Sequence, residues 1–600
     1  MQTSGIRAPA LSGRGWLNTG GRALSLAELR GKIVLLDFWT FCCINCLHVL
    51  DELRGLEQKY TDVLVVIGVH SPKFAHEADP DALAAAVDRY DVTHPVLDDP
   101  GLATWQQYAV RAWPTLVVVD PTGYVVAQHS GEGHGHALDV LLGQLVDKHD
   151  SAGTLHRGDG PFVAPEPVAS TLRFPSKAIR VRDGGWLVAD TGHHRLVELD
   201  DDAAIVRRSI GTGKQGLVDG GAGDARFNEP SGLCLLPPDV ARSVGYDAVV
   251  ADTVNHALRG VRLVDGAVST LVGDGEPWMR GDRTQRLSSP WDVTWFDTQV
   301  VVAMAGIHQL WTFDPLTRTA GVLAGTTSEG LVDGTAERAW LAQPSGLAAA
   351  ADAATLWFVD SETSSLRRLR NGVVHTAVGR GLFDFGHRDG PADDALLQHP
   401  LGVTELADGT VAVADTYNGA VRRYDPLTGE VTTLATDLAE PSDVVVDGDV
   451  LLVVESAAHR LVRIRLPESA LVVSGEARRT RRPTTDVAPG DVELSVLFAP
   501  PAGQKLDDRY GPATFLTVSA SPPELLVDGT GSGYDLTRSL RFGDVPSSAG
   551  DASPGWWRVC CTSRCGRRRV TTSRWPTRPA MSTSRTGAYP SASRSAGRCA

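Results

Sequence analysis

The chain has 600 residues, of which 42 % are hydrophobic and 22 % are charged, with a formal net charge of −15. A single hydrophobic core does not grow to this length, so we expect a soluble globular protein of two to four domains. The longest apolar runs have the length of strands, so we expect no helix that crosses a membrane.

The charge is distributed unevenly along the chain. Residues 552–600 hold ten arginines and no acidic residue, so the net charge of −15 becomes −25 once these ten positive charges are set aside. An acidic body is a poor partner for nucleic acid or for an anionic membrane, and we expect neither as a partner. Met1–Leu29 lacks the pattern of a targeting sequence. We therefore predict a cytoplasmic location, where a Cys-x-x-Cys pair is more often catalytic than structural.

Residues 5–148 alternate between strand and helix patterns, which indicates an α/β domain with a partly parallel sheet. Ile33–Trp39 is predicted as a buried strand, and apolar residues from Cys46 to Tyr60 recur with helical spacing. Further strands are expected at Val63–Val69, Thr115–Asp120 and Tyr124–His129, and further helices near Ala82–Tyr90, Leu102–Tyr108 and His136–Val146.

A cluster of three cysteines, Cys42-Cys43-Ile44-Asn45-Cys46, lies between the first of these strands and its following helix. A thiol at the start of a helix faces unpaired backbone N–H groups and the positive end of the helix dipole, and both favour the reactive thiolate. A second thiol one turn later can displace a group that the first has captured. The order strand, Cys-x-x-Cys, helix therefore predicts dithiol–disulfide exchange.

This domain resembles the thioredoxin superfamily at two places. Leu36-Asp37-Phe38-Trp39 matches the Val-Asp-Phe-Trp that precedes the family's active cysteines, and Trp113-Pro114-Thr115 matches its cis-proline motif. The resemblance implies that Cys43 is the nucleophile and Cys46 the resolving thiol, with Asp37 as the buried carboxylate that exchanges a proton with Cys46. It also implies that Trp113, Pro114 and Thr115 form a substrate groove around a cis peptide bond.

The chain departs from the family pattern between and before the two cysteines. Ile44-Asn45 stands where Gly-Pro is usual, and Cys42 replaces the usual tryptophan. Cys42 is a candidate accessory thiol with three roles open to it: a second resolving thiol, a regulatory site or a small packing residue. We favour the packing role, because neighbouring cysteines form strained disulfides.

Two other chemistries compete with the redox interpretation. Cys42, Cys43, Cys46 and His48 offer zinc ligands, but no second Cys-x-x-Cys completes a site. The pairs His70 with His76 and His129 with His134 follow predicted strands and are interpreted as turn residues. A peroxidase is disfavoured because Leu36 stands where its Thr-x-x-Cys pattern requires proline. We therefore predict neither a metal nor a cofactor.

A repeated pattern begins after a linker at residues 149–169 and fills residues 170–468. Each repeat has a proline, a short apolar strand, and then Val-Ala-Asp-Thr or a variant of it. The six repeated prolines are Pro175, Pro230, Pro290, Pro344, Pro400 and Pro441. The pattern resembles NHL repeats, and six copies imply a six-bladed β-propeller. The Asp-Thr pairs are interpreted as organisers of turns, and the ring as a face for binding a partner or substrate.

One segment of the repeats imitates a dinucleotide-binding motif. Gly211–Gly216 fits G-x-G-x-x-G, but no helix pattern follows it. The sequence Gly-Leu-Val-Asp-Gly at residues 216–220 recurs at 330–334, and a looser version ends at Asp389-Gly390. A repeated blade loop explains all three, so no cofactor is predicted there.

The C-terminal part contains a β-rich domain at residues 488–545, with strands expected at Asp491–Ala499 and Ala513–Ala520. The composition then changes abruptly in residues 552–600, which hold four cysteines and three tryptophans. A disordered basic arm and a cysteine-rich zinc module are both considered for this tail. We favour a third interpretation, translation in the wrong frame, which would leave the β-rich domain truncated.

Taken together, the chain resembles the thioredoxin-like proteins that contain NHL repeats. The implied fold class is multidomain: an α/β thioredoxin-like domain, an all-β six-bladed propeller and a small β-rich C-terminal domain. The implied function is a cytosolic thiol–disulfide oxidoreductase that acts on a protein or small-molecule disulfide, with the propeller as a platform for a protein partner or substrate. The alternative is a propeller interaction scaffold whose thioredoxin-like module senses redox state or has little activity.

Overall fold

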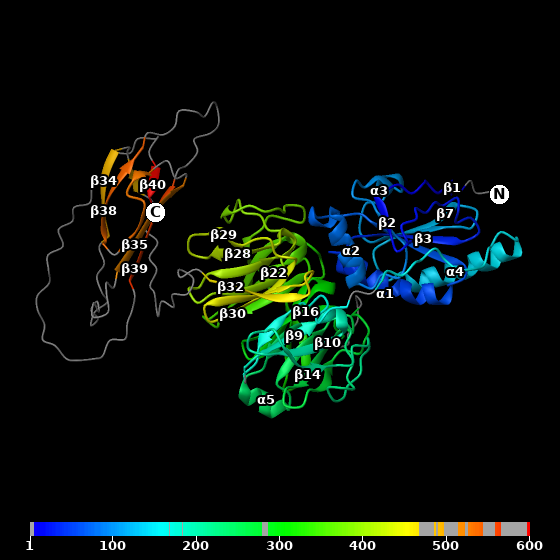
Figure 1. Ribbon diagram of the computed structural model, residues 1–600, viewed down its shortest axis with the longest axis horizontal. Helices are drawn as coiled ribbons and strands as arrows, with labels where there is room; N and C mark the ends of the chain where they lie inside the picture. The colour runs from blue at the N-terminus through cyan, green and yellow to red at the C-terminus, as the bar shows by residue number, and fades with distance from the viewer. Residues whose placement is uncertain are drawn as a thin grey trace, which may run out of the picture. The chain divides into compact units, whose positions relative to one another are not determined.

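The computed structural model describes residues 5–166, 169–182, 184–278 and 286–466, and beyond them the segments 485–487, 490–496, 514–521, 526–533, 535–543, 558–565 and 597–599. The chain forms two compact units, Met1–Leu471 and Val472–Ala600 (Figure 1). None of the helices within these described residues is long and apolar enough to cross a membrane.

The first unit begins with a seven-stranded mixed sheet in the order β1-β7-β6-β3-β4-β5-β2. Its strands are β1 (Ile6–Arg7), β2 (Gly15–Leu17), β3 (Ile33–Trp39), β4 (Leu64–His70), β5 (Val96–Asp98), β6 (Thr115–Val119) and β7 (Tyr124–Ser130). The helices are α1 (Ile44–Lys59), α2 (Pro80–Arg89), α3 (Ala103–Gln107) and α4 (Gly135–Ser151), with a short 3₁₀ turn η1 (His76–Ala78). β3 is parallel to β4 and antiparallel to β6, so the predicted partly parallel sheet is confirmed.

Strand β3 is buried on both faces, and its alternating side chains enter two different cores. Ile33 and Leu35 pack against α1 and α4, whereas Val34, Leu36 and Phe38 pack toward α3. Because side chains alternate across a strand, Asp37 shares the face of Leu35, which α1 covers. The alternation of side chains along β3 therefore directs Asp37, the one acidic residue of this strand, toward α1.

The predicted boundary between the first domain and the linker falls inside a helix. α4 continues to Ser151, three residues beyond the predicted end of the domain at residue 148. The following residues also pack on the sheet domain, because the backbone N–H of His156 donates to the carbonyl of Gly31 at 2.8 Å. Lys32 Nζ donates to the carbonyl of Gly158 at 2.5 Å.

Residues 178–465 form six antiparallel sheets of three to five strands. The first three consist of β8 (Ala178–Arg180), β9 (Trp186–Asp190), β10 (Arg195–Leu199) and β11 (Val206–Ile210); β12 (Pro230–Leu235), β13 (Ala248–Asp252), β14 (Ala257–Arg262) and β15 (Ala267–Val272); and β16 (Pro290–Phe296), β17 (Gln299–Met304), β18 (Gln309–Asp314) and β19 (Thr319–Ala324). One helix, α5 (Pro238–Val244), interrupts the second sheet.

The fourth, fifth and sixth sheets come next along the chain. They consist of β20 (Gly334–Thr335), β21 (Pro344–Ala349), β22 (Thr355–Asp360), β23 (Ser365–Arg370) and β24 (Val373–Val378); β25 (Gly390–Pro391), β26 (Gly402–Glu405), β27 (Val411–Asp415), β28 (Ala420–Asp425) and β29 (Glu430–Ala435); and β30 (Pro441–Asp447), β31 (Val450–Glu455) and β32 (Arg460–Arg465). The 3₁₀ turns η2 (Thr191–His193), η3 (Ala305–Ile307), η4 (Ser361–Thr363) and η5 (Thr416–Asn418) directly follow β9, β17, β22 and β27, respectively.

The six sheets close into a ring, which is the arrangement of a β-propeller. The inner strands β8, β12, β16, β21, β26 and β30 lie beside one another in this order, and β30 lies beside β8. Hydroxyl groups join neighbouring sheets, since Thr253 Oγ1 donates to the carbonyl of Pro290 at 2.8 Å and Thr416 Oγ1 to that of Pro441 at 2.8 Å. The threonine of the repeated Asp-Thr pair thus links each of these sheets to the next.

The aspartate of the Asp-Thr pair and the Gly-Leu-Val-Asp-Gly loop act together. Asp252 is fully buried and holds Arg259 Nη1 at 2.7 Å, and Arg259 Nη2 reaches Asp219 of the loop at 2.8 Å. The same triads recur as Asp360–Arg367–Asp333 and Asp415–Arg422–Asp389. The Gly-Leu-Val-Asp-Gly loop at residues 216–220, which continues the dinucleotide-like glycines at 211–216, therefore has a structural role.

The second unit contains two sheets, one of β33, β40, β39, β35 and β37 and one of β34, β38 and β36. Their bounds are β33 (Thr485–Val487), β34 (Gly490–Ser495), β35 (Thr514–Ser521), β36 (Leu526–Asp528), β37 (Gly531–Gly533), β38 (Thr537–Phe542), β39 (Arg558–Cys565) and β40 (Gly597–Cys599). β34 and β35 correspond to the two expected strands. Apart from β39 and β40, the tail at 552–600 lies outside the described residues, and its reading frame stays a prediction.

Candidate active site

Cys43 occupies the position directly before the first residue of α1. Its backbone is extended, with φ −87° and ψ 111°, and its carbonyl accepts hydrogen bonds from the N–H groups of Cys46 at 3.0 Å and Leu47 at 3.2 Å. The first turn of α1 contains no acidic residue. The Cys43 side chain is half-buried, so its sulfur combines partial access with the positive end of the helix.

Cys46 and Asp37 lie behind Cys43 in the interior. The thiol of Cys46 is fully buried and within hydrogen-bonding reach of Cys43; burial first, then this contact, raises its pKa well above the usual range. The charge of Asp37 raises it further. Burial, followed by the charge of Glu57, raises the pKa of Asp37 to about 8. Both Asp37 carboxylate oxygens lack a hydrogen-bond partner among the described residues, so this group is free to exchange a proton.

The predicted cis-proline motif is confirmed in its backbone geometry. The peptide bond between Trp113 and Pro114 is cis. Trp113 is half-buried and its Nε1 donates to the carbonyl of Ser71 at 2.8 Å, while Thr115 Oγ1 donates to the carbonyl of Ala112 at 2.8 Å. Trp113 and Cys43 both pack against the buried cluster that contains Cys46, so the motif belongs to the same site.

The structure adds a buried carboxylate, Glu77, that the sequence did not single out. It accepts hydrogen bonds from the hydroxyl of Thr40 at 2.6 Å and the backbone N–H of Cys42 at 2.9 Å. Its second oxygen accepts from the N–H groups of Lys73 and Phe74, both at 2.9 Å. Burial is the main cause that raises the pKa of Glu77. Glu77 therefore fixes the loop that leads into the cysteines.

Cys42 lies where the loop meets the propeller. Gln343 Oε1 accepts from the backbone N–H of Ile44 at 2.7 Å, and Gln343 Nε2 donates to the carbonyl of Cys42 at 2.9 Å. Burial and then the nearby carboxylate of Glu362 raise the pKa of the Cys42 thiol. Glu362 also forms a buried ion pair with Lys73. The favoured packing role of Cys42 is thus compatible with its burial, but its surroundings are polar and belong partly to the propeller.

The residue before each repeated proline faces the thioredoxin-like domain. These six residues all have positive φ, between 44° and 57°: Phe174, Glu229, Ser289, Gln343, His399 and Glu440. Ser289 Oγ bonds with His48 Nε2 at 2.7 Å, and Glu440 Oε1 accepts from His76 Nε2 at 2.9 Å. The position before the proline was a signal in the repeat pattern that sequence reasoning left unused.

The candidate zinc ligands have other partners. His48 bonds through Nδ1 to Glu132 at 2.5 Å and through Nε2 to Ser289. Within the described ranges of the chain, no group of three or more His, Cys, Asp or Glu residues is placed to hold a metal ion. His70 is not a turn residue as interpreted above: it ends β4, is fully buried and stacks on Phe41. Burial lowers its pKa to about 3.

Comparison with known proteins links both halves of the first unit to relatives. A family model described as thioredoxin-like matches residues 31–125. Over 513 residues the chain is 35 % identical to the Arabidopsis thaliana protein SUPPRESSOR OF QUENCHING 1, chloroplastic, covering 78 % of this chain and 48 % of the relative. Over 471 residues it is 37 % identical to NHL repeat-containing protein 2 of Gallus gallus, covering 72 % of this chain and 63 % of the relative.

A third relative matches the first domain by itself. The thiol-disulfide oxidoreductase ResA of Halalkalibacterium halodurans is 27 % identical over 114 residues, which are 18 % of this chain and 61 % of that protein. The chain thus spans about half to two thirds of the length of these curated relatives. The fold, the family match and the long alignments agree with one another. The chain thus joins a thioredoxin-like domain to a propeller of repeated sheets, and it is similar to NHL repeat-containing protein 2.

Proposed function

We propose that this chain is a thiol–disulfide oxidoreductase that uses Cys43 and Cys46. The observation that carries the proposal is the arrangement of three groups: a half-buried thiol before α1, a buried thiol within its reach, and, beside the second thiol, a buried carboxyl that has no hydrogen-bond partner in the described part of the chain. The relationship of the first domain to thiol-disulfide oxidoreductases supports it.

The proposed reaction has two exchange steps. The thiolate of Cys43 attacks one sulfur of a substrate disulfide, forms a mixed disulfide and releases the other sulfur as a thiolate. The ionised form of Asp37, a minor fraction at pH 7 because its pKa is about 8, then takes the proton of Cys46, and the Cys46 thiolate attacks the Cys43 sulfur. This step releases the second substrate thiolate and leaves a Cys43–Cys46 disulfide, so two electrons pass from the chain to the substrate. A dithiol reductant returns the pair to its starting state.

We further propose that the propeller is a platform for this chemistry, and that the substrate is a protein or small-molecule disulfide. Gln343 bonds on both sides of Cys43, to the carbonyl of Cys42 and the N–H of Ile44. These contacts hold the backbone that carries the nucleophile. The half-buried Trp113 beside the cysteines then provides the open side on which a substrate disulfide can approach.

The same contact favours a second candidate function, in which the thioredoxin-like module senses redox state for the propeller. A disulfide between Cys43 and Cys46 changes the backbone that Gln343 holds, so oxidation can reach the repeats without turnover of a substrate. Steady-state turnover distinguishes the two candidates, since a sensor reacts once and a reductase reacts repeatedly.

The test measures reduction of a peptide disulfide by the full chain with excess dithiol reductant. We expect Cys43→Ser to lower the rate at least 100-fold, and Cys46→Ser to accumulate the mixed disulfide, visible by mass spectrometry. Cys234→Ala, which removes a buried propeller thiol, is the matched control and keeps the wild-type rate. A wild-type rate no higher than that of Cys43→Ser would refute the proposed turnover.

A further inference from the structure

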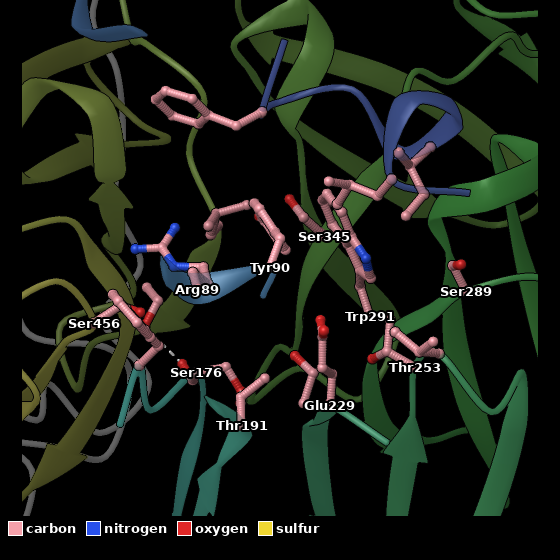
Figure 2. A pocket seen from close by; sticks show the side chains of 18 of the residues that line it. Arg89, Tyr90, Ser176, Thr191, Glu229, Thr253, Ser289, Trp291, Ser345 and Ser456 are labelled. Carbon is pink, nitrogen blue, oxygen red and sulfur yellow. Dashed lines mark hydrogen bonds between the residues drawn. The ribbon is translucent and has the colours of Figure 1, made fainter. Parts of the chain in front are cut away.

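A cavity of about 140 Å³ lies between the cysteine helix and the mouth of the propeller ring. Ile44, Leu47 and His48 of α1 form one wall. Every sheet of the ring contributes the residue that follows its repeated proline: Ser176, Ser231, Trp291, Ser345, Leu401 and Ser442. Figure 2 shows this cavity with side chains from both domains converging on it.

Several hydroxyl groups of the wall donate their hydrogens to the protein itself. Thr253 and Ser345 donate to the carbonyls of Pro290 at 2.8 Å and Pro400 at 3.0 Å. Thr191 Oγ1 donates to the carbonyl of Pro230 at 2.7 Å. A hydroxyl that donates its only hydrogen keeps its lone pairs. The wall therefore offers hydrogen-bond acceptors to a bound molecule.

The cationic side chains of the wall are already paired. Arg89 binds Glu440, and Arg54 donates to Asp51 and to the carbonyls of Tyr90 and Asp91. Lys177 also lines the cavity; its Nζ lies 3.4 Å from Asp292 and 3.5 Å from Asp443 and donates to the carbonyl of Leu401. Two carboxylates thus lie beside this one ammonium group, so Lys177 brings no net positive charge to the cavity.

Among the described residues Glu229 forms no ion pair, because Arg54 and Arg89, whose charges act on it, are bound directly to Asp51 and Glu440. Its backbone N–H donates to His194, but among the residues the structure describes its carboxylate has no hydrogen-bond or ion-pair partner. Figure 2 shows this carboxylate pointing into the cavity between Thr191 and Thr253, with Trp291 nearby. Burial, followed by the charge of Asp51, raises the pKa of Glu229 to about 8, and the charges of Arg54 and Arg89 offset only part of this rise.

We propose that this cavity binds a primary ammonium group, with its charge on Glu229, its N–H groups on the acceptor wall and its hydrocarbon part against Trp291 and Leu401. An ammonium group carries three donors and no acceptor, which matches a wall of lone pairs around one carboxylate. A cavity of about 150 Å³ holds one benzene molecule, so the ligand has roughly five to eight heavy atoms. Both a free alkylamine and the side chain of a peptide lysine satisfy these limits.

The test is calorimetric titration of the full chain with n-butylamine and with n-butanol, which has a similar size and no charge. We expect n-butylamine to bind at least tenfold more tightly. Glu229→Gln should weaken n-butylamine at least tenfold and leave n-butanol unchanged. The matched control is Glu337→Gln, which alters an exposed glutamate outside the cavity and leaves both affinities at the wild-type value.

A second titration identifies the source of the ammonium group. It uses a blocked Gly-Lys-Gly tripeptide and the same peptide with norleucine in place of lysine. Binding of the lysine peptide supports a peptide ligand, and binding of n-butylamine without the lysine peptide supports a free amine. If neither compound binds, or if Glu229→Gln binds n-butylamine as the wild type does, the site is overturned. Neither titration depends on cysteine chemistry, so the result is independent of the proposed redox function.

Discussion

The thioredoxin-like domain and the propeller both bury aspartates completely, but these aspartates differ in the hydrogen-bond and ion-pair partners of their carboxylates. Asp252, Asp360 and Asp415 of the propeller each hold a buried arginine at 2.7 to 2.9 Å, together with backbone N–H groups. Asp37 has no partner for either oxygen among the described residues. The pKa of Asp252 rises to about 6, because Arg259 offsets part of the effect of burial, whereas that of Asp37 rises to about 8.

The difference separates structural from reactive carboxylates. A buried charge that is paired and hydrogen-bonded fixes the position of the strands and loops around it. A buried carboxyl without partners costs stability, and such groups gather at functional sites because their protons can be exchanged near neutral pH. The four predictions below test this separation, from the largest expected effect to the smallest.

The largest effect is expected from Arg367→Met in the fourth sheet. The change removes the partner of Asp360 and of Asp333 and leaves a carboxylate uncompensated inside the protein. Breaking a buried pair in this way costs about 3–5 kcal/mol, which urea unfolding monitored by circular dichroism measures. Arg465→Met is the control, because Arg465 is 84 % exposed and its removal should change stability by less than about 0.5 kcal/mol. Similar losses in both variants would mean that the triads do not stabilise the ring.

Asp37→Asn should separate activity from stability. The rate of the second exchange step should fall about 100-fold at pH 7, because asparagine cannot take the proton of Cys46. The stability of the wild type should fall as pH rises from about 4, where an exposed aspartate ionises, to about 8, because folded Asp37 keeps its proton in this window and the unfolded chain loses it.

The variant lacks this pH dependence, so its advantage in melting temperature over the wild type should grow up to about pH 8. Rapid-quench measurement of the mixed disulfide gives the rate, and melting at pH 4, 6 and 8 gives the stability. Asp202→Asn changes an exposed aspartate and serves as the control. A variant that is less stable than the wild type at pH 8 would place Asp37 with the structural aspartates.

Glu77→Gln examines an intermediate case, a buried carboxylate with four hydrogen bonds and no strongly paired cation. Glutamine keeps one acceptor oxygen and turns an NH₂ group toward two backbone N–H groups, so two hydrogen bonds are lost. We expect a loss of about 1–3 kcal/mol in urea unfolding and a several-fold slower reduction of the peptide disulfide. Unchanged stability would show that the loop before the cysteines does not depend on this carboxylate.

Gln343→Ala should have the smallest effect, because the side chain is neutral. It removes the bonds to Cys42 and Ile44 and should cost about 1–2 kcal/mol. Hydrogen exchange at the amide of Ile44 should accelerate at least tenfold, which mass spectrometry of peptide fragments measures. His399→Ala alters the equivalent position of the next repeat and should leave this amide unchanged. Protection equal to that of the wild type would mean that Gln343 does not hold the cysteine loop.

Much of the first domain could be predicted because its signals are local. The apolar run Ile33–Trp39 became β3 with the same bounds, and the helical spacing after Cys43 became α1. The cis bond before Pro114 followed from a three-residue match. Glu77 was missed because the two partners that tie it to the cysteine loop, Thr40 and Cys42, lie 37 and 35 residues away and its own surroundings carry no pattern.

In the repeats, too, the sequence pattern could not predict contacts between residues that lie far apart along the chain. Their prolines and Asp-Thr pairs predicted the strands, but the arginine partner of each aspartate lies seven residues later, and the second aspartate that this arginine binds lies in the preceding loop. Gln343 is about 300 residues from Cys42, so no window of sequence could place them together. The positive φ before each proline was likewise invisible, because Phe, Glu, Ser, Gln and His occupy that position.

By itself the sequence determined the order strand, dithiol, helix and the repetition of blade strands, because hydrophobic spacing and turn residues act over a few positions. The tertiary structure decided which polar groups keep partners. It left the carboxyl of Asp37 without a hydrogen-bond partner among the described residues, and it gave the propeller aspartates their arginines. The cost of burying a charge depends on what the folded chain brings within about 4 Å of it, and the order of residues does not specify those neighbours.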